Sequence, residues 1–150
     1  MSVRASAKSR HIDRAQGVAR ALLAERGLRA TRGRIDVLGM LLQSADALSH
    51  HDVEQRLSSA HGIDRVTLYR VLDWLTAQGL AHKVAGDDRV WRFSSAGHRE
   101  PAGHAHFQCS ACHRVVCLDE TRTPAVALPA GFQRADVEVT VKGTCDACTS

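Results

Sequence analysis

The chain has 150 residues, of which 44% are hydrophobic and 24% charged, so it can bury one ordinary core or two small ones. No apolar run approaches the roughly 18 residues of a membrane span, and the polar, basic N-terminus lacks the apolar stretch of a signal peptide. Both features argue against a membrane protein and predict a soluble, cytoplasmic one. Residues 1–93 hold 15 Lys and Arg against 10 Asp and Glu, whereas residues 94–150 hold 5 against 6. The basic half indicates phosphate binding, although a modest excess of Arg is also typical of a solvated surface.

The first part of the chain shows helical periodicity. Residues 1–10 are small, polar and basic, and we expect them to be disordered. From Ile12 onward, apolar residues recur at helical spacing, and Ser, Thr or Asp stands at each later helix start, where it can act as an N-cap. The predicted helices are residues 12–26, 32–43, 50–60 and 65–78, and the predicted N-caps are Thr31, Ser49 and Asp64.

Two short strand-like runs follow the helices, at residues 80–84 and 89–93, and the intervening Ala-Gly-Asp-Asp segment predicts a hairpin turn. Helices followed by such a hairpin indicate a winged helix-turn-helix. We therefore predict a DNA-binding domain over residues 1–93. Residues 94–103 contain Ser, Gly, Ala and one Pro, which is typical of a hinge linker, and residues 104–150 form a second domain.

The fourth predicted helix carries an amphipathic pattern. Leu68 and the leucines four and seven residues after it form one buried stripe. Arg70 lies about 200° around the helix from the first of these and points away from the stripe, with Thr67 and Tyr69 beside it. An exposed Arg can bridge guanine O6 and N7, and the two hydroxyls suit phosphate oxygens. An ordinary surface helix would show the same pattern, but the preceding helix and short connection favour a recognition helix.

Two Cys-x-x-Cys hooks lie in the second half. Cys109 and Cys112 form the first, and Cys145 and Cys148 form the second after 32 intervening residues. Four thiolates in this pattern predict a closed, structural Zn²⁺ site. Two disulfides or a redox pair are the alternatives, but the predicted cytoplasmic location and the absence of a βαβ pattern favour zinc.

A second metal site is predicted from histidines near the first hook. His104 and His106 alternate along a strand, so their side chains share one face, and imidazole suits zinc, iron and copper. Cys117, on a strand over residues 115–119, could add a thiolate, although a small buried hydrophobe is its ordinary role. His82, in the predicted wing, could reach the same ion from the other domain.

Five segments together resemble the ferric uptake regulator family, in the family's order and over almost the whole chain. They are residues 27–34, 66–72, 78–80, 104–112 and 143–148. The resemblance implies an α+β fold with an N-terminal winged helix-turn-helix domain and a small C-terminal α/β dimerisation domain that holds a structural zinc site of four cysteines. It also implies a homodimer and metal-dependent repression at palindromic double-stranded operator DNA. Within the family, the chain is most similar to the zinc uptake regulators, because His82 stands three residues after Gly79.

The resemblance also implies roles for individual residues. The four cysteines of the hooks match the structural zinc site, and His82, His104 and His106 match a regulatory site between the domains. The cysteine or glutamate usual at the end of the wing is absent, so Cys117 is the favoured fourth ligand and His98 the second candidate. The residues predicted to contact DNA are Arg65, Thr67, Tyr69 and Arg70. His51 is added to them because it stands where related zinc regulators carry a DNA-contacting tyrosine.

The sequence therefore predicts a zinc-responsive regulator that represses zinc-uptake genes, with one structural and one regulatory Zn²⁺ per chain and no small organic substrate. An iron-responsive regulator of the same family is one alternative, and it is weakened by the lack of carboxylates among the predicted ligands. A zinc storage or delivery protein is another, but it would have no need for an exposed Arg70. An enzyme is not expected, since no catalytic signature accompanies Asp119 and Glu120 beside Cys117.

Overall fold

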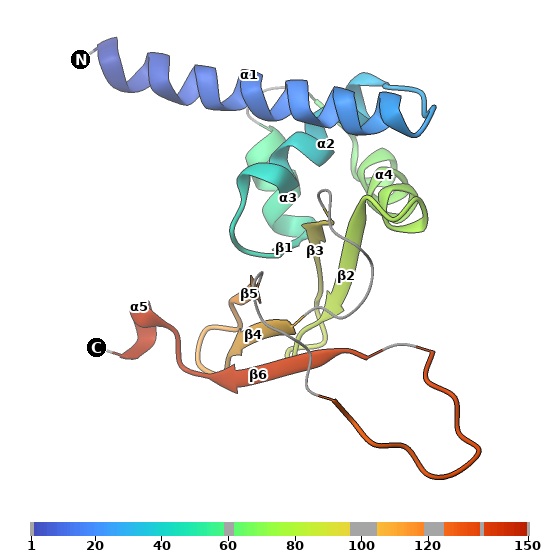
Figure 1. Cartoon of the computed structure of the whole chain (residues 1–150). Coiled ribbons are helices and arrows are strands. Elements are labelled where there is room, and N and C mark those ends of the chain that lie inside the picture. The colour runs from blue at the N-terminus through green and yellow to red at the C-terminus, as the bar shows by residue number, and fades with distance from the viewer. Residues whose placement is uncertain (1, 59–61, 97–104, 119–124, 136, 150) are drawn as a thin grey trace.

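The structure is a computed structural model that describes residues 2–58, 62–96, 105–118, 125–135 and 137–149, with backbone only for residues 2–7 and 58. It contains a larger helical lobe, called here the first lobe, and a smaller lobe built on a second sheet, called the second lobe (Figure 1). The first lobe consists of α1 (Ser2–Glu25), α2 (Arg32–Gln43), β1 (Leu48–Ser49), α3 (His50–Ser58), α4 (Arg65–Ala77), β2 (Ala81–Ala85) and β3 (Trp91–Ser95). The second lobe consists of β4 (Ala105–Cys109), β5 (Val115–Leu118), β6 (Val139–Gly143) and α5 (Asp146–Thr149).

The predicted helix starts are confirmed at α2 and α4. The Thr31 side chain accepts a hydrogen bond from the backbone N–H of Arg34, and Asp64 accepts one from the backbone N–H of Thr67 at 2.8 Å. Each of these caps satisfies a backbone donor that the first helical turn would otherwise leave without a partner. Gly79, with φ 71°, ends α4 in the left-handed conformation that glycine adopts most easily.

The first helix is longer than predicted. It begins at Ser2, whereas residues 1–10 were expected to be disordered and the helix to begin at Ile12. Residues 2–16 contain neither Gly nor Pro, so nothing in them interrupts a helix. Among the residues whose side chains are described, the apolar stripe that packs on the core starts at Ala15, and Ile12 is 37% exposed. Local propensity therefore extends α1 beyond the part that the core holds.

One apolar core fills the first lobe. Leu68, Leu72 and Leu75 of α4 are at most 1% exposed, which confirms the predicted stripe, and they meet side chains of α1, α2, α3 and the hairpin. Fully burying each such leucine stabilises the fold by about 1.5–3 kcal/mol. The most deeply buried partners are Ala19, Leu23, Val37, Leu38, Val53 and Phe93. The core thus fixes α4 relative to the hairpin.

Each lobe has a three-stranded sheet. The first has the order β1-β3-β2 and is antiparallel, and its short β1 lies in a segment that the sequence predicted as loop. The second has the order β5-β4-β6, in which β4 pairs antiparallel with β5 and parallel with β6. The hairpin of β2 and β3 is the predicted wing, and its β3 runs to Ser95, within the segment predicted as the hinge. No helix in the described ranges is long and apolar enough to cross a membrane.

The two faces of the wing have different neighbours. Phe93 points into the core of the first lobe, whereas Val84 packs with Ala47 and Val115 in a small apolar cluster between the lobes. The backbone N–H of Ala47 also donates to the carbonyl oxygen of Val115 at 2.8 Å. At the turn of the wing, Lys142 of β6 forms an ion pair with Asp87 at 2.9 Å. The wing therefore links the core of the first lobe to the sheet of the second (Figure 1).

Candidate metal centres

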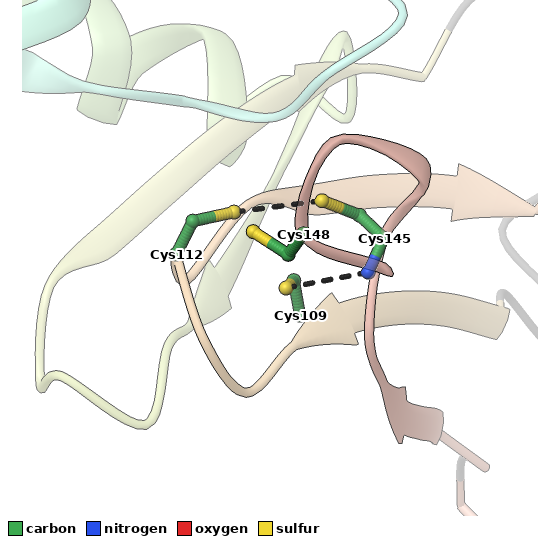
Figure 2. Close-up of side chains that lie close together, drawn as sticks. All are labelled: Cys109, Cys112, Cys145 and Cys148. Carbon is green, nitrogen blue, oxygen red and sulfur yellow. Dashed lines mark hydrogen bonds between the residues drawn. The ribbon is translucent and has the colours of Figure 1, made fainter. Parts of the chain in front are cut away.

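The four cysteines of the two hooks meet at one end of the second sheet. The Sγ atoms of Cys109, Cys112, Cys145 and Cys148 all lie within 4.8 Å of one another, and the four side chains point toward a common centre (Figure 2). Sγ of Cys112 lies 3.7 Å from Sγ of Cys145, and the backbone N–H of Cys145 donates to Sγ of Cys109. No disulfide joins any of the five cysteines, all of which lie in the described part of the chain. This geometry therefore argues against the alternative of two disulfides.

Strand pairing explains how hooks so distant in sequence come together. The parallel pairing of β4 with β6 sets Cys109 opposite Gly143, so the chain enters the second hook two residues later. The backbone N–H of Ser110 donates to the carbonyl oxygen of Gly143 at 2.8 Å and closes this end of the pair. His113, with φ 63°, turns the chain after the first hook toward β5.

The electrostatics of this cluster favour a bound cation. Backbone N–H groups of Cys112 and Cys145 lower the pKa of Cys109 to about 6, whereas the neighbouring sulfurs of Cys145 and Cys112 raise the pKa of Cys148 to about 12. One thiolate thus forms readily, but four adjacent thiolates repel one another unless a positive ion lies among them. Four sulfur donors at these separations suit a tetrahedral divalent ion such as Zn²⁺.

A second cluster joins the two lobes. One nitrogen of His82 in β2, one of His106 in β4 and Sγ of Cys117 in β5 all lie within 4.8 Å of one another. His106 and Cys117 are directly opposite in the β4–β5 ladder, and the ring centroids of His82 and His106 are 5.9 Å apart. The cluster therefore needs both lobes in contact. Two other residues predicted for this site, His98 and His104, lie outside the described residues.

The donor set of the second cluster also fits a metal ion. Two imidazoles and a thiolate are borderline to soft ligands, which suit zinc, whereas the structure adds no carboxylate to this group among the described residues. His106 is 3% exposed, so an ion held there would be shielded from water on that side. That these residues are ligands stays a prediction.

The exposed face of α4 carries the residues predicted to contact DNA. Tyr69 and Arg70 are exposed, and the Tyr69 ring stacks on His50 with centroids 3.8 Å apart. Thr67 and Arg65 already have partners, because the Thr67 hydroxyl donates to Asp64 and Arg65 pairs with Glu54 at 3.2 Å. His51 is exposed at the start of α3. DNA contact by these side chains stays a prediction.

Sequence reasoning missed two residues near these sites. The His50 ring stacks on Tyr69 and packs edge-on against Phe93, with ring centroids 4.9 Å apart in the second pair. In the sequence, only its position as an aromatic residue at a helix start could have marked it. Arg114 links the lobes, since its Nε lies 3.0 Å from Asp46 and its Nη1 lies 3.0 Å from Asp146. Nothing in the sequence marks these long-range pairs.

Comparison with known proteins agrees with this architecture. Residues 25–141 match the model of the ferric uptake regulator family. The chain is 31% identical over 130 residues to the transcriptional regulator FurA of Mycobacterium tuberculosis strain H37Rv, covering 81% of this chain and 84% of that protein. It is 29% identical over 135 residues to the zinc uptake regulation protein of Escherichia coli K12, covering 85% and 77% of the two chains.

Solved structures share the fold. A zinc uptake regulator complexed with zinc and DNA superposes with a TM-score of 0.67 at 23% identity, covering 92% of this chain and 95% of that one. The ferric uptake regulator of Helicobacter pylori gives a TM-score of 0.60 at 15% identity, covering 93% and 94%. These likenesses confirm the predicted α+β class, with an N-terminal winged helix-turn-helix domain and a smaller C-terminal domain. The family match over most of the chain, together with the identity to FurA, establishes that the chain belongs to the ferric uptake regulator family of transcriptional regulators.

Proposed function

We propose that the protein is a zinc-responsive repressor, which binds palindromic operator DNA as a homodimer when zinc is bound and represses zinc-uptake genes. The observation that carries this proposal is the second cluster, in which His82 of the wing meets His106 and Cys117 of the other lobe. Only a closed arrangement of the lobes brings these donors together. Metal binding to this cluster can therefore control the orientation of the first lobe.

The donor chemistry favours zinc over iron. His82, His106 and the predicted ligand His104 supply imidazole, and Cys117 supplies a thiolate. Such a set is softer than the carboxylate-containing sites that suit iron, and it matches the tetrahedral preference of zinc. Relatives of both kinds exist, since FurA and a zinc uptake regulation protein are similar to this chain. The ligand set is therefore the basis for the choice of metal.

The four-cysteine cluster is proposed as a structural zinc site. It lies within one lobe and joins the end of β4 to the C-terminal hook, so metal binding there does not depend on the relative position of the two lobes. A second zinc per chain, held by His82 and its partners between the lobes, would be the regulatory one. The first domain is proposed to extend to Ser95, where β3 ends two residues beyond the predicted boundary at residue 93, and the second domain is proposed to begin at residue 104.

The wing transmits the state of the regulatory site to α4. A bound zinc ion would neutralise the thiolate and hold the imidazoles at fixed angles, so His82 would be tied to the second lobe. Phe93 on the opposite face of the wing is buried in the same core as Leu72 of α4, so the wing and the recognition helix move together. A hundredfold difference in zinc affinity between closed and open states corresponds to about 2.7 kcal/mol, within the usual range of allosteric coupling.

DNA binding is assigned to the exposed face of α4. Arg70 is proposed to read base edges in the major groove, and Tyr69, Thr67, Arg65 and His51 to contact the backbone. In a homodimer, two such helices would meet major-groove faces about 34 Å apart, or a multiple of that, which requires a palindromic operator.

The second lobe offers a surface for the partner copy. The edge strand β6 is largely exposed and carries Val141, 45% exposed, and the preceding segment exposes Val126, Leu128 and Phe132, the last by 68%. Exposed apolar side chains on an edge strand and on the segment before it are consistent with a protein–protein interface. A homodimer through this surface would leave both first lobes free to reach DNA.

The proposal is tested by zinc titration of operator binding in the wild type, in His82→Ala and in the control His11→Ala, whose side chain is exposed on α1. Zinc should tighten operator binding by the wild type and the control, and His82→Ala should bind with little dependence on zinc. Fe²⁺ in place of Zn²⁺ should be less effective. Equal zinc dependence in His82→Ala would overturn the proposal, and tight zinc binding without any DNA binding would favour a storage or delivery protein.

A further inference from the structure

Ser94 of β3 lies beside the second metal cluster. In the antiparallel ladder of the wing it is directly opposite His82 of β2. Directly opposed residues of such a ladder project to the same face, with Cβ atoms about 4.5–5.5 Å apart. The Ser94 hydroxyl and the His82 imidazole are therefore neighbours on one face of the wing.

This face is the one that meets the second lobe. Val84, two residues after His82 on the same face, packs against Val115 of β5. The neighbours of Ser94 in sequence point the other way, since side chains alternate along a strand, and Phe93 is fully buried in the first lobe. Ser94 thus belongs to the contact between the lobes and not to the core that carries α4.

The hydroxyl of Ser94 is buried without a hydrogen-bond partner. The residue is 6% exposed, and its Oγ has no partner among the described residues. A buried hydroxyl in this condition destabilises a fold, because it has lost its contacts with water and gained none in return. Alanine would fit the same place without that cost, so the hydroxyl indicates a role beyond packing.

We propose that Ser94 is a positioning residue for the regulatory zinc site, and that its hydroxyl accepts a hydrogen bond from the ring N–H of zinc-bound His82. An imidazole that binds a metal through one nitrogen carries its proton on the other, and that N–H requires an acceptor. The acceptor fixes the tautomer and the ring orientation, and it raises the basicity of the ligating nitrogen. The proposal rests on the proposed function of the second cluster and extends it to a residue that does not touch the ion.

The wing thus holds Ser94 and His82 side by side before the lobes close. Ser94 and His82 are held in register by the same hairpin, so the geometry of the pair does not depend on the second lobe. Closure of the lobes then only has to add His106 and Cys117. Substitution of Ser94 should change zinc affinity at this site and leave the four-cysteine site unaffected.

The experiment uses the full-length protein with zinc retained in the four-cysteine site, and titrates Co²⁺ and Zn²⁺ into the second site against a competing chelator. Ser94→Ala should weaken binding by about 10- to 100-fold, the usual effect of losing such a partner, and should shift the cobalt absorption bands. Ser94→Thr keeps the hydroxyl and should stay within about threefold of the wild type. Ser95→Ala, which alters the adjacent residue on the opposite face, is the matched control and should behave as the wild type.

Thermal unfolding of each variant without the second metal separates this role from a merely structural one. Ser94→Ala should be as stable as the wild type or slightly more stable, because it removes an unsatisfied buried group. If Ser94→Ala binds metal at the second site as tightly as the wild type while His82→Ala does not, the inference is wrong and the proposed function stands. If His82→Ala also binds unchanged, the proposed function fails and the inference fails with it.

Discussion

Arg114 lies between two aspartates from different lobes. Its Nε is 3.0 Å from Asp46, in the loop before β1, and its Nη1 is 3.0 Å from Asp146, between the two cysteines of the second hook. One guanidinium therefore connects the four-cysteine cluster to the first lobe. Asp46 also forms a β-bridge with Val116, so the ion pair adds to a contact that the backbone already makes.

Loss of this contact should weaken DNA binding even when both metal sites are filled. Arg114→Ala removes an ion pair that is about one-third exposed, so we expect a loss of about 0.2–1 kcal/mol, or up to about fivefold in operator affinity. A double-mutant cycle with Asp46→Ala should return the same coupling energy. Arg20→Ala, which removes an exposed arginine of α1, is the control. Additive effects of Arg114→Ala and Asp46→Ala would show that the pair carries no coupling.

The two clusters should respond differently to loss of a thiolate. Cys148→Ser removes one donor of the four-cysteine site and should cost the structural zinc, with a marked fall in melting temperature, because metal binding there is coupled to folding. Cys117→Ser should reduce zinc from two to one per chain and leave the fold intact. Elemental analysis of purified protein and a thermal scan measure both effects. An unchanged zinc content in Cys117→Ser would remove this residue from the regulatory site.

Arg70 should determine which base sequence is bound. Arg70→Ala is expected to cost about 1–3 kcal/mol on the operator and much less on unrelated DNA, because a bidentate contact to guanine carries sequence information. Arg65→Ala is the comparison, since Arg65 pairs with Glu54 and is proposed to meet phosphate. Binding curves on operator and random duplexes at two salt concentrations measure the difference. A loss of equal size on both duplexes would make Arg70 a phosphate contact instead.

His50 should make stability depend on pH. Burial lowers its pKa below 6.5; Asp73 opposes this shift, and Lys83 adds to it. Between the folded pKa and 6.5 the unfolded chain binds more protons, so this contribution to the free energy of unfolding is present above pH 6.5 and is lost as pH falls through the folded pKa.

The His50→Phe variant should keep the stack on Tyr69 and lose this pH dependence. Urea unfolding of the variant and the wild type between pH 5 and 7.5 would measure the difference in their pH dependence. Metal release affects both proteins equally, so its effect cancels in this comparison. Parallel pH curves for the two proteins would mean that His50 titrates equally in the folded and unfolded states.

Sequence signals predicted local features well. The caps Thr31 and Asp64, the leucine stripe of α4 and the glycine that ends it act within a few residues, and the structure confirms them. The two hooks could be read because Cys-x-x-Cys spacing itself encodes the ligand geometry. Family resemblance, not periodicity, supplied the joining of His82 to the histidines of the other lobe.

Long-range pairings could not be read in the same way. Arg114 and Asp46 are 68 positions apart, and the parallel pairing of β4 with β6 has no local signature. The start of α1 was missed because the prediction followed the apolar stripe, whereas the helical propensity of its N-terminal residues, which include neither Gly nor Pro, favours a longer helix. The sequence places Ser94 at the end of the wing, where the family usually carries a cysteine or glutamate, but only its register opposite His82 reveals its surroundings.

The alternation of side chains along the wing places residues that contact the core of the first lobe and residues that contact the second lobe on opposite faces. If the proposed regulatory site is correct, residues that face the core with Phe93 would set how α4 is presented to DNA, whereas residues that face the second lobe with Ser94 would set the metal concentration at which the protein responds. Single substitutions on the Ser94 side would then change the response threshold without changing the set of target genes.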